Sequence, residues 1–568
     1  MNISVIPRLT ILLAALLQGI ALWALDTVLE NQWSLSQQPV ALYICYTLTL
    51  ALLTMLQLGL RRDNDQRMGI GLMLSGLMMA LFAGYLGLQL LPAGSVYQDH
   101  IRFNFISIMT LLSFLALIYW QSWAAGDTSG YAALFRFAWR NVLILGLSAL
   151  FTLIFWGLLQ LCAELFQLIG IDFFNRLFDH SWFYYPVLAV VFGVGIMLFR
   201  SLESLLDTIL RVLQIFSQWL LPLLLVIALL FLLALPFTGL QVLWDTGKGT
   251  ALILSLLGLL LFFINAVYQH GGHVPYARWL HRLLYLGVLL LPIFSMIAAY
   301  GLYLRLQQYG FTVERGWALV TWAFLTAFCL GYAWLILRRG NAWTQGLGQI
   351  NGVLGILLVI TLMVLSSPWV DFRKISAHHQ LTRFQQNHDF SNLDIWYLSY
   401  HLGRPGYLAI EQLKTEYADN EEALQQLNDG SYDNWQGDLS RPTRQQFAQS
   451  FSVYPENYPV PKELMDAIYQ NVAAWYGPEQ RHWYLLFVDL NHDHQPDPVL
   501  IEDQQQWGYA QLWSRTNGYW DYQAVNVDAT DNWEDRSFAD RLQMSPPKAV
   551  TPEWDNLRIG SVEVHITY

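Results

Sequence analysis

The chain has 568 residues, of which 55% are hydrophobic and 13% are charged, and its formal net charge is −11. Soluble proteins carry about 25% charged residues, so this composition excludes an ordinary soluble enzyme. The net negative charge argues against a nucleic-acid partner, because phosphate binding needs clustered Lys and Arg.

Charge divides the chain into two parts. Residues 1–370 contain 13 acidic and 17 basic residues, whereas residues 371–568 contain 29 acidic and 14 basic residues. The cysteines Cys45, Cys162 and Cys329 all lie in the first part, so the acidic part can form no disulfide framework or cysteine zinc site. The sequence predicts a transmembrane domain over 1–367 and an acidic extramembrane domain over 368–568.

The first domain is predicted to be an all-α polytopic bundle of about 11 spans. A helix crosses the roughly 30 Å hydrocarbon layer with about 20 mostly apolar residues. The first apolar stretch has features of a signal peptide, but it is long enough to span and is interpreted as a retained helix. The predicted spans are 8–29, 39–60, 68–91, 103–124, 141–169, 183–199, 214–236, 249–268, 279–304, 314–337 and 348–367.

Basic residues in the short loops predict the orientation. One alternate set of loops, which includes 61–67 and 338–339, carries eleven arginines, and the other set carries five Lys or Arg. Cytoplasmic loops are the ones enriched in Lys and Arg. The sequence therefore predicts a cytoplasmic N-terminus and an acidic C-terminal domain on the outer side, which for a bacterial plasma membrane is the periplasm.

Charged groups near the outer ends of the spans are the candidates for solute or partner contact. Glu164 is one of the few acidic residues inside the predicted spans, and Arg305 and Arg315 flank a predicted outer loop. Ionisable groups in a membrane are costly and often functional. A water-facing position at the outer interface is the alternative interpretation of Glu164.

The second domain is predicted to be α+β, with helices over 368–475 followed by an antiparallel sheet. Alternating apolar residues and turn signals predict strands at 483–490, 497–503, 507–516, 518–528 and 557–567. Asn517-Gly518 lies between two aromatic-rich strands, and this dipeptide favours a two-residue hairpin.

The segment between the first two of these strands has the oxygen-rich spacing of a calcium loop. Alternate oxygen ligands of a tight loop can converge on a hard cation. The candidate ligands are Asp489, Asn491, Asp493, Gln495 and Asp497. His494 stands where a glycine normally permits the sharp turn, and Leu500 stands where a bidentate Glu would close the site. A hairpin whose Asp and Asn side chains cap their own backbone is the alternative.

No catalytic residues are predicted. The sequence has no G-x-S-x-G elbow, Walker loop or H-E-x-x-H zinc motif. Calcium is the only candidate cofactor.

Two stretches of the first domain carry a family resemblance. The run Tyr309-Gly310-Phe-Thr-Val-Glu314-Arg315-Gly-Trp317-Ala and the run Trp182-Phe-Tyr-Tyr-Pro186 resemble the bacterial polytopic membrane family catalogued as domain of unknown function 4153. The resemblance covers most of residues 1–370 and implies an inner-membrane location, but no reaction, substrate or catalytic residue. The segment from Arg305 to Trp317 is where a shared function is expected.

The sequence is compatible with three functions. The first is a non-enzymatic envelope protein for sensing, binding or scaffolding, with the lipid bilayer and an envelope protein as partners. The second is a transporter or flippase-like carrier, in which Glu164, Arg305 and Arg315 line a route for a polar or anionic solute. The third is a membrane-embedded transferase that uses outward carboxylates on a lipid-linked substrate.

Overall fold

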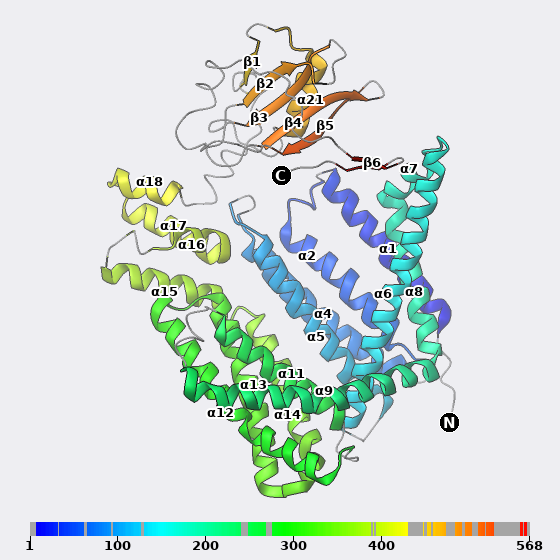
Figure 1. Ribbon diagram of the computed structural model, residues 1–568, viewed down its shortest axis with the longest axis vertical. Coiled ribbons are helices and arrows are strands. Elements are labelled where there is room, and N and C mark those ends of the chain that lie inside the picture. The colour runs from blue at the N-terminus through cyan, green and yellow to red at the C-terminus, as the bar shows by residue number, and fades with distance from the viewer. Residues whose placement is uncertain are drawn as a thin grey trace. The chain divides into compact units, whose positions relative to one another are not determined.

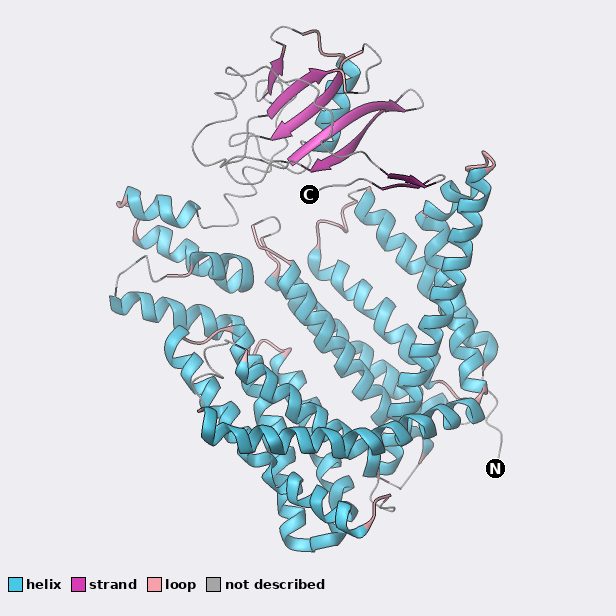
Figure 2. Ribbon diagram, viewed as in Figure 1, coloured by secondary structure: helices cyan, strands magenta, loops and turns pink. Residues whose placement is uncertain are grey.

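The computed structural model divides the chain into two compact units, Met1–Gly430 and Ser431–Tyr568. The residues that it describes are 7–31, 33–61, 65–92, 95–126, 130–239, 248–268, 275–387, 390, 393–429, 447, 451–455, 458–472, 483–490, 495–502, 509–516, 519–526, 557–559 and 562–564. Figure 2 shows that the first unit is helical and that the strands belong to the second.

The first unit consists of long apolar helices and four shorter helices that follow them. The long-helix region comprises α1 (Arg8–Glu30), α2 (Pro39–Thr47), the π-helix η1 (Leu48–Leu52), α3 (Leu53–Gly59), α4 (Asp65–Gln89), α5 (Asp99–Ala125), α6 (Tyr131–Leu168), α7 (Phe173–Asp179), α8 (Ser181–Ser201), α9 (Glu203–Thr238), α11 (Gly249–Tyr268), α12 (Arg278–Tyr309), α13 (Val313–Arg339), the 3₁₀-helix η3 (Gly340–Gly346) and α14 (Leu347–Leu365). The shorter helices are α15 (Phe372–Asn387), α16 (Ile395–His401), α17 (Arg404–Glu416) and α18 (Glu421–Asp429).

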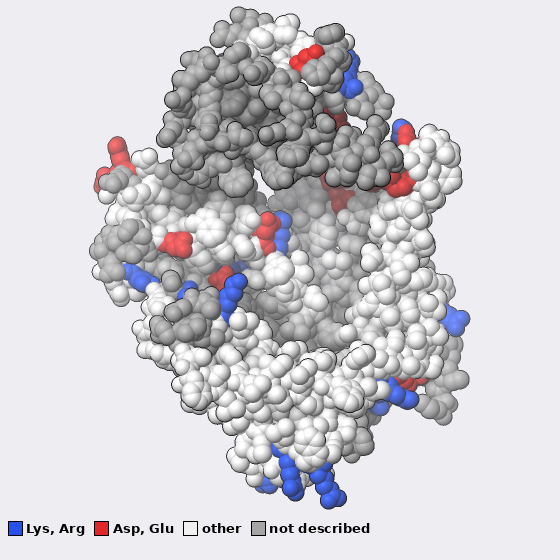
Figure 3. All heavy atoms as spheres, viewed as in Figure 1, with Lys and Arg blue, Asp and Glu red and all other residues white. Residues whose placement is uncertain are grey.

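These helices confirm the predicted polytopic bundle. Within the described residues, ten helical stretches are long and apolar enough to cross a membrane. The last of them, Val313–Leu365, contains both α13 and α14, which the sequence predicts as separate spans. Figure 3 shows that charged side chains are sparse on the visible flanks of these helices and that basic ones gather at the end of the α11–α14 group that is lowest in the view.

The long helices form two groups, which lie side by side in Figure 1. The first group contains α1 to α8 and has a core around Met68, Met79 and Leu117. The second contains α11 to α14 and has a core around Leu257, Phe294 and Trp343. Helix α9 contributes Leu221 and Leu225 to the second core, and α5 joins the groups where Leu112 packs near Leu362 of α14.

The shorter helices pack together in a further core of the first unit. Leu398, Leu402 and Leu413 are fully buried there and share this core with Val313 of α13. The first compact unit thus contains residues 368–429 as well as the long helices. The predicted boundary at 367/368 concerns the edge of the membrane, and it stays a prediction.

The second unit confirms the predicted sheet domain. Its sheet has the order β1-β2-β3-β4-β5, with β1 parallel to β2 and the other pairs antiparallel. Its elements are β1 (Phe451–Tyr454), α21 (Lys462–Val472), β2 (Trp483–Val488), β3 (Asp497–Glu502), β4 (Tyr509–Thr516), β5 (Tyr519–Asn526), β6 (Leu557–Ile559) and β7 (Val562–Val564). The core contains Leu464 and Ile468 of α21 together with Leu485 and Trp513 of the sheet.

Two details of this unit differ from the prediction. Strand β1 lies in a stretch predicted to be helical, because a four-residue strand is too short to show a clear alternation. The predicted strand 557–567 is instead the antiparallel pair β6 and β7. The predicted hairpin is present, since Thr516 pairs with Tyr519; the two residues that join them lie outside the described part.

Candidate functional site

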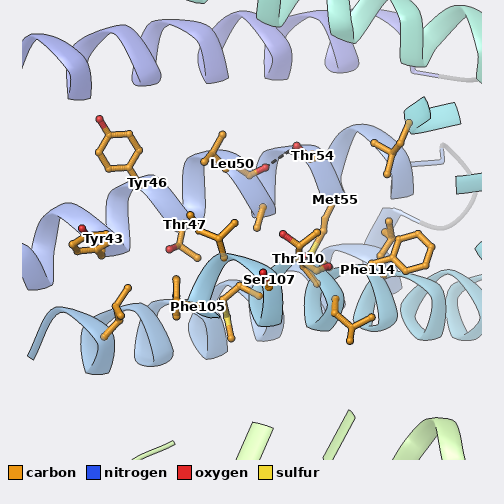
Figure 4. A pocket seen from close by; sticks show the side chains of 18 of the residues that line it. Tyr43, Tyr46, Thr47, Leu50, Thr54, Met55, Phe105, Ser107, Thr110 and Phe114 are labelled. Atoms are coloured by element: carbon orange, nitrogen blue, oxygen red, sulfur yellow. Dashed lines mark hydrogen bonds between the residues drawn. The ribbon is translucent and has the colours of Figure 1, made fainter. Parts of the chain in front are cut away.

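A cavity of the first unit forms a groove between the continuous helix α2-η1-α3 and helix α5. Its volume is about 760 Å³, which lies within the roughly 300–1,000 Å³ of typical ligand sites. Figure 4 shows Tyr43, Tyr46, Thr47, Leu50, Thr54 and Met55 of the first wall and Phe105, Ser107, Thr110 and Phe114 of the second. Leu50 and Ile106 line the groove and are 50% and 62% exposed, so one side of the groove is open.

Two glycines of α4 let α2 pack closely against this helix. A Cβ atom at Gly87 would lie 2.4 Å from Cα of Val40 on α2, and one at Gly84 would lie 3.5 Å from Ile44. Small residues let two membrane helices approach closely. Helix α2 thus packs backbone to backbone on α4 beside the groove that it forms with α5.

The π-helix η1 lies in the middle of the first wall. Such π-bulges are rare and occur frequently at functional sites. From α1 behind it, Gln18 Nε2 donates to the Leu50 carbonyl at 3.4 Å and to Thr54 Oγ1 at 3.3 Å. Gln57 Nε2 in turn donates to Gln18 Oε1 at 2.8 Å. These amide bonds tie the irregular turn to α1 and to the end of α3.

Arg200 of α8 fixes the far end of the same wall. Its side chain is buried, and its guanidinium donates to the carbonyls of Gln57 and Leu60, the second at 2.7 Å. The last carbonyls of a helix lack partners within the helix, and a cation stabilises its negative end. Arg200 therefore caps the end of α3.

The interior of the groove is lined mainly by apolar groups. The hydroxyls of Thr54, Ser107 and Ser113 donate to the carbonyls of Leu50, Phe103 and Thr110 at 2.6–3.0 Å. Hydroxyls that bond to a carbonyl of their own helix use their donor locally and do not offer it to a ligand. The walls therefore suit an apolar chain better than a polar solute.

The polar rim, which we define as Tyr43, Gln98, Asp99 and Arg102, lies at the end of the groove where α2 and α5 begin. Arg102 Nε donates to the Tyr43 hydroxyl at 2.5 Å, and its Nη2 donates to Gln98 Oε1. Nη1 of Arg102 is 3.7 Å from Oδ1 of Asp99. The side chains of Arg102 and Asp99 are 44% and 69% exposed, so this rim presents both a positive and a negative charge to its surroundings.

A second polar cluster joins α4 to the start of α15. Asp371 is buried, accepts from the backbone N–H of Arg373 at 2.9 Å and caps α15. It also accepts from the Arg373 guanidinium at 2.9–3.0 Å and from the Tyr85 hydroxyl at 2.6 Å. Burial raises the pKa of the Asp371 carboxyl, but Arg373 and Tyr85 outweigh it and hold this pKa below its ordinary value.

A neighbouring contact joins the start of α13 to α16. Glu314 Oε1 lies 3.5 Å from Nδ1 of His401, whose ring stacks on that of His100 at 4.3 Å. The cavity between these contacts is about 70 Å³, enough for small occupants only. The geometry is that of a joint between helices.

The structure corrects the predicted outer loop between Arg305 and Trp317. Helix α12 continues to Tyr309 and α13 begins at Val313, so only a short turn separates them. Gly310 has φ +75°, and a Cβ there would lie 2.9 Å from His379. Arg315 donates from Nη1 to the Gly310 carbonyl at 2.6 Å. The turn is a packed joint with α15.

The three predicted contact residues lie on different helices. Glu164 is exposed on α6, which packs on α5, α7 and α8, whereas Arg305 and Arg315 lie on α12 and α13. None of the three lines either cavity described above. Their predicted role in contacting a solute or partner stays a prediction.

The predicted calcium loop is described only in part. Asn491 and Asp493 lie outside the described residues, whereas Asp489, Gln495 and Asp497 lie within them. Asp497 Oδ2 accepts from the backbone N–H of Leu490 at 2.9 Å, which is the contact expected of the hairpin alternative. No three His, Cys, Asp or Glu side chains of the described part form a group that could hold a metal. Calcium binding stays a prediction.

Neither the groove nor the polar residues behind it carry a motif in the sequence. Arg102 and Arg200 are isolated basic residues at the ends of apolar runs, and Gln18 and Gln57 stand alone within such runs. The amides of Gln18 and Gln57 are the available sign of a contact, because amides are rare inside predicted spans and a polar group in hydrocarbon needs a hydrogen-bond partner. That signal indicates a polar contact between helices but not which helices it joins.

The apolar helices, the groove between them and the sparse charge define the class: a multi-pass membrane protein. The chain belongs to the family described as "Domain of unknown function (DUF4153)", which matches residues 4–413. The matched region contains all the long helices and extends into α17. A comparison with curated proteins and one with solved structures gave no match.

Proposed function

We propose that this chain is a non-enzymatic binding protein of the bacterial inner membrane, which holds the apolar part of an amphiphile in the α2–α5 groove. The observation that carries the proposal is a cavity of about 760 Å³ with hydrocarbon walls and a charged rim. Apolar surface inside and polar groups at one end are the features that recognise an amphiphile.

Loop charge supports an orientation for this groove. The excess of arginine in one set of loops favours a cytoplasmic N-terminus. The rim at the start of α2 and α5 then belongs to the outer leaflet. The eleven spans predicted from the sequence are an odd number, which supports a periplasmic position for the acidic C-terminal unit, where it is available to an envelope protein partner.

The two other functions have less support. A carrier of a polar solute needs polar groups along its route, but the hydroxyls of Thr54, Ser107 and Ser113 in this groove bond to their own helices. A transferase needs facing carboxylates, and Asp371 in the smaller cavity is already bonded to Arg373 and Tyr85.

The proposal is tested by filling the groove. Ala51 lines the groove on η1, so Ala51→Trp places an indole in the space of the bound chain. Leu153→Trp on α6 is the matched control, because Leu153 is 67% exposed and does not line the groove.

The measurement is the number of phospholipids that the full chain retains through detergent exchange, counted by native mass spectrometry. We expect Ala51→Trp to lose one retained lipid that the wild type and Leu153→Trp keep. Equal retention in all three proteins would contradict the proposal.

A further inference from the structure

We infer that the groove selects one zwitterionic phospholipid of the outer leaflet, with the phosphate at Arg102 and the ammonium group at Asp99. The inference rests on the proposed function and names the ligand class of the same groove. It depends on the charges of the rim and on the length of the groove.

The rim holds Arg102 in a position to bind a phosphate. Tyr43 and Gln98 accept hydrogen bonds from Nε and Nη2 and so fix the plane of the guanidinium. The contact between Nη1 and Asp99 is 3.7 Å, longer than a hydrogen bond. A phosphate oxygen can therefore take a charge-assisted bond from Nη1 without displacing the two neutral partners.

Asp99 determines which headgroup complements the rim. Its side chain is 69% exposed, and its Oδ1 lies 3.7 Å from Nη1 of Arg102, the atom proposed to donate to the phosphate. A purely anionic headgroup would meet repulsion from this carboxylate, whereas an ammonium beside the phosphate would be attracted to it. The charges of the rim thus favour a phosphoethanolamine headgroup over a phosphoglycerol headgroup.

The depth of the groove matches an acyl chain. Tyr43 and Leu58 mark the two ends of the first wall, and fifteen residues of helix separate them, about 22 Å at 1.5 Å per residue. One leaflet occupies about half of the roughly 30 Å hydrocarbon layer. The groove is therefore long enough to hold one leaflet's acyl chain below a headgroup at the rim.

Competition between lipids on the full-length protein tests the inference. The protein is incubated with equal amounts of phosphatidylethanolamine, phosphatidylglycerol and diacylglycerol of one chain length, and the bound species are counted by native mass spectrometry. We expect phosphatidylethanolamine to dominate in the wild type. Arg102→Gln should lower both phospholipids about 10-fold relative to diacylglycerol, because a charge-assisted bond is lost.

A second pair of variants separates the two charges. Asp99→Asn should raise phosphatidylglycerol over phosphatidylethanolamine by about 2- to 5-fold, as expected of an exposed charge. Arg102→Lys keeps the charge and should retain most of the selection. The control is Arg176→Gln, since Arg176 forms a similar exposed pair with Asp172 at 4.0 Å on α7 and should leave the lipid ratios unchanged.

The outcomes distinguish this inference from the proposed function. If Ala51→Trp removes the lipid but Arg102→Gln and Asp99→Asn leave the lipid ratios unchanged, the inferred headgroup selection is wrong, whereas the proposed binding of an apolar chain in the groove stands. If Ala51→Trp also has no effect on lipid retention, the proposed function and the inferred headgroup selection are both wrong. Glycerophosphoethanolamine, which has the headgroup without acyl chains, should not displace the lipid at millimolar concentration. Displacement would mean a site for a soluble phosphate and would overturn the inference.

Discussion

Tyr332→Phe tests whether the polar groups inside the α11–α14 group hold the helices together. Tyr332 is fully buried on α13. Its hydroxyl donates to Asn351 Oδ1 of α14 at 2.6 Å and accepts from Asn265 Nδ2 of α11 at 2.9 Å. Asn351 Nδ2 also donates to Asn265 Oδ1 at 2.5 Å. The substitution removes two bonds and leaves the direct bond between the asparagines.

The magnitude follows from these contacts. Hydrogen bonds between membrane helices contribute about 0.6 kcal/mol on average and about 1.7 kcal/mol at most. Two lost bonds therefore reduce the free energy of opening this helix group by about 1–3 kcal/mol. A change of 1.4 kcal/mol is tenfold in an equilibrium constant, so the open population should rise about 5- to 150-fold.

A buried thiol on the same helix reports this opening. Cys329 lies on α13 and is fully buried, so a maleimide reaches it only when the helices separate. The assay measures its alkylation rate in a background where Cys45 and Cys162 are replaced by Ala. Tyr303→Phe on α12 is the control, because Tyr303 is 56% exposed and its hydroxyl only accepts from Gln307 at 3.2 Å. An unchanged rate in Tyr332→Phe would refute the reasoning.

Three further predictions follow from the packing, the titratable groups and the loop charges. Gly87→Leu should lower the free energy of unfolding by about 1–3 kcal/mol or more, because it overpacks α4 on α2, and it should abolish lipid retention. Gly69→Leu is the control, because a Cβ there has open space, and it should change neither property. Thermal unfolding measures the stability and native mass spectrometry measures the retained lipid. The lowered pKa of Asp371 gives stability that is complete above the ordinary carboxyl pKa of about 4 and is lost as the pH falls through the lowered value. Asp371→Asn should therefore flatten the fall in the unfolding midpoint below pH 4, and an identical profile would contradict the assignment. Alkaline phosphatase, a reporter active only in the periplasm, should be active when fused after residue 400 and inactive after residues 65 and 130; activity at 65 would reverse the orientation.

Hydrophobicity and charge predict the architecture because they act on long segments. Each predicted span from 8–29 to 348–367 corresponds to a helix or a continuous helix in the structure, since about 20 apolar residues have few alternatives in a membrane. Alternation in the strands likewise predicts β2 to β5. The loop expected between Arg305 and Trp317 was wrong, because polar residues at helix ends resemble loop residues.

The groove could not be predicted because it depends on which helices touch. Gly87 is one of several glycines in α4, and only its contact with Val40 distinguishes it. Arg102 is one of seventeen basic residues in the first 370, and its role depends on Tyr43, 59 residues earlier. Such pairings come from tertiary packing, which periodicity and composition do not encode.

An electron cryomicroscopy map of the full chain in phosphatidylethanolamine nanodiscs tests the central claim most directly. We expect elongated density between α2 and α5, with its head at Arg102 and its tail reaching Leu58. A map in which α2 packs directly on α5 and leaves no space between them would contradict it.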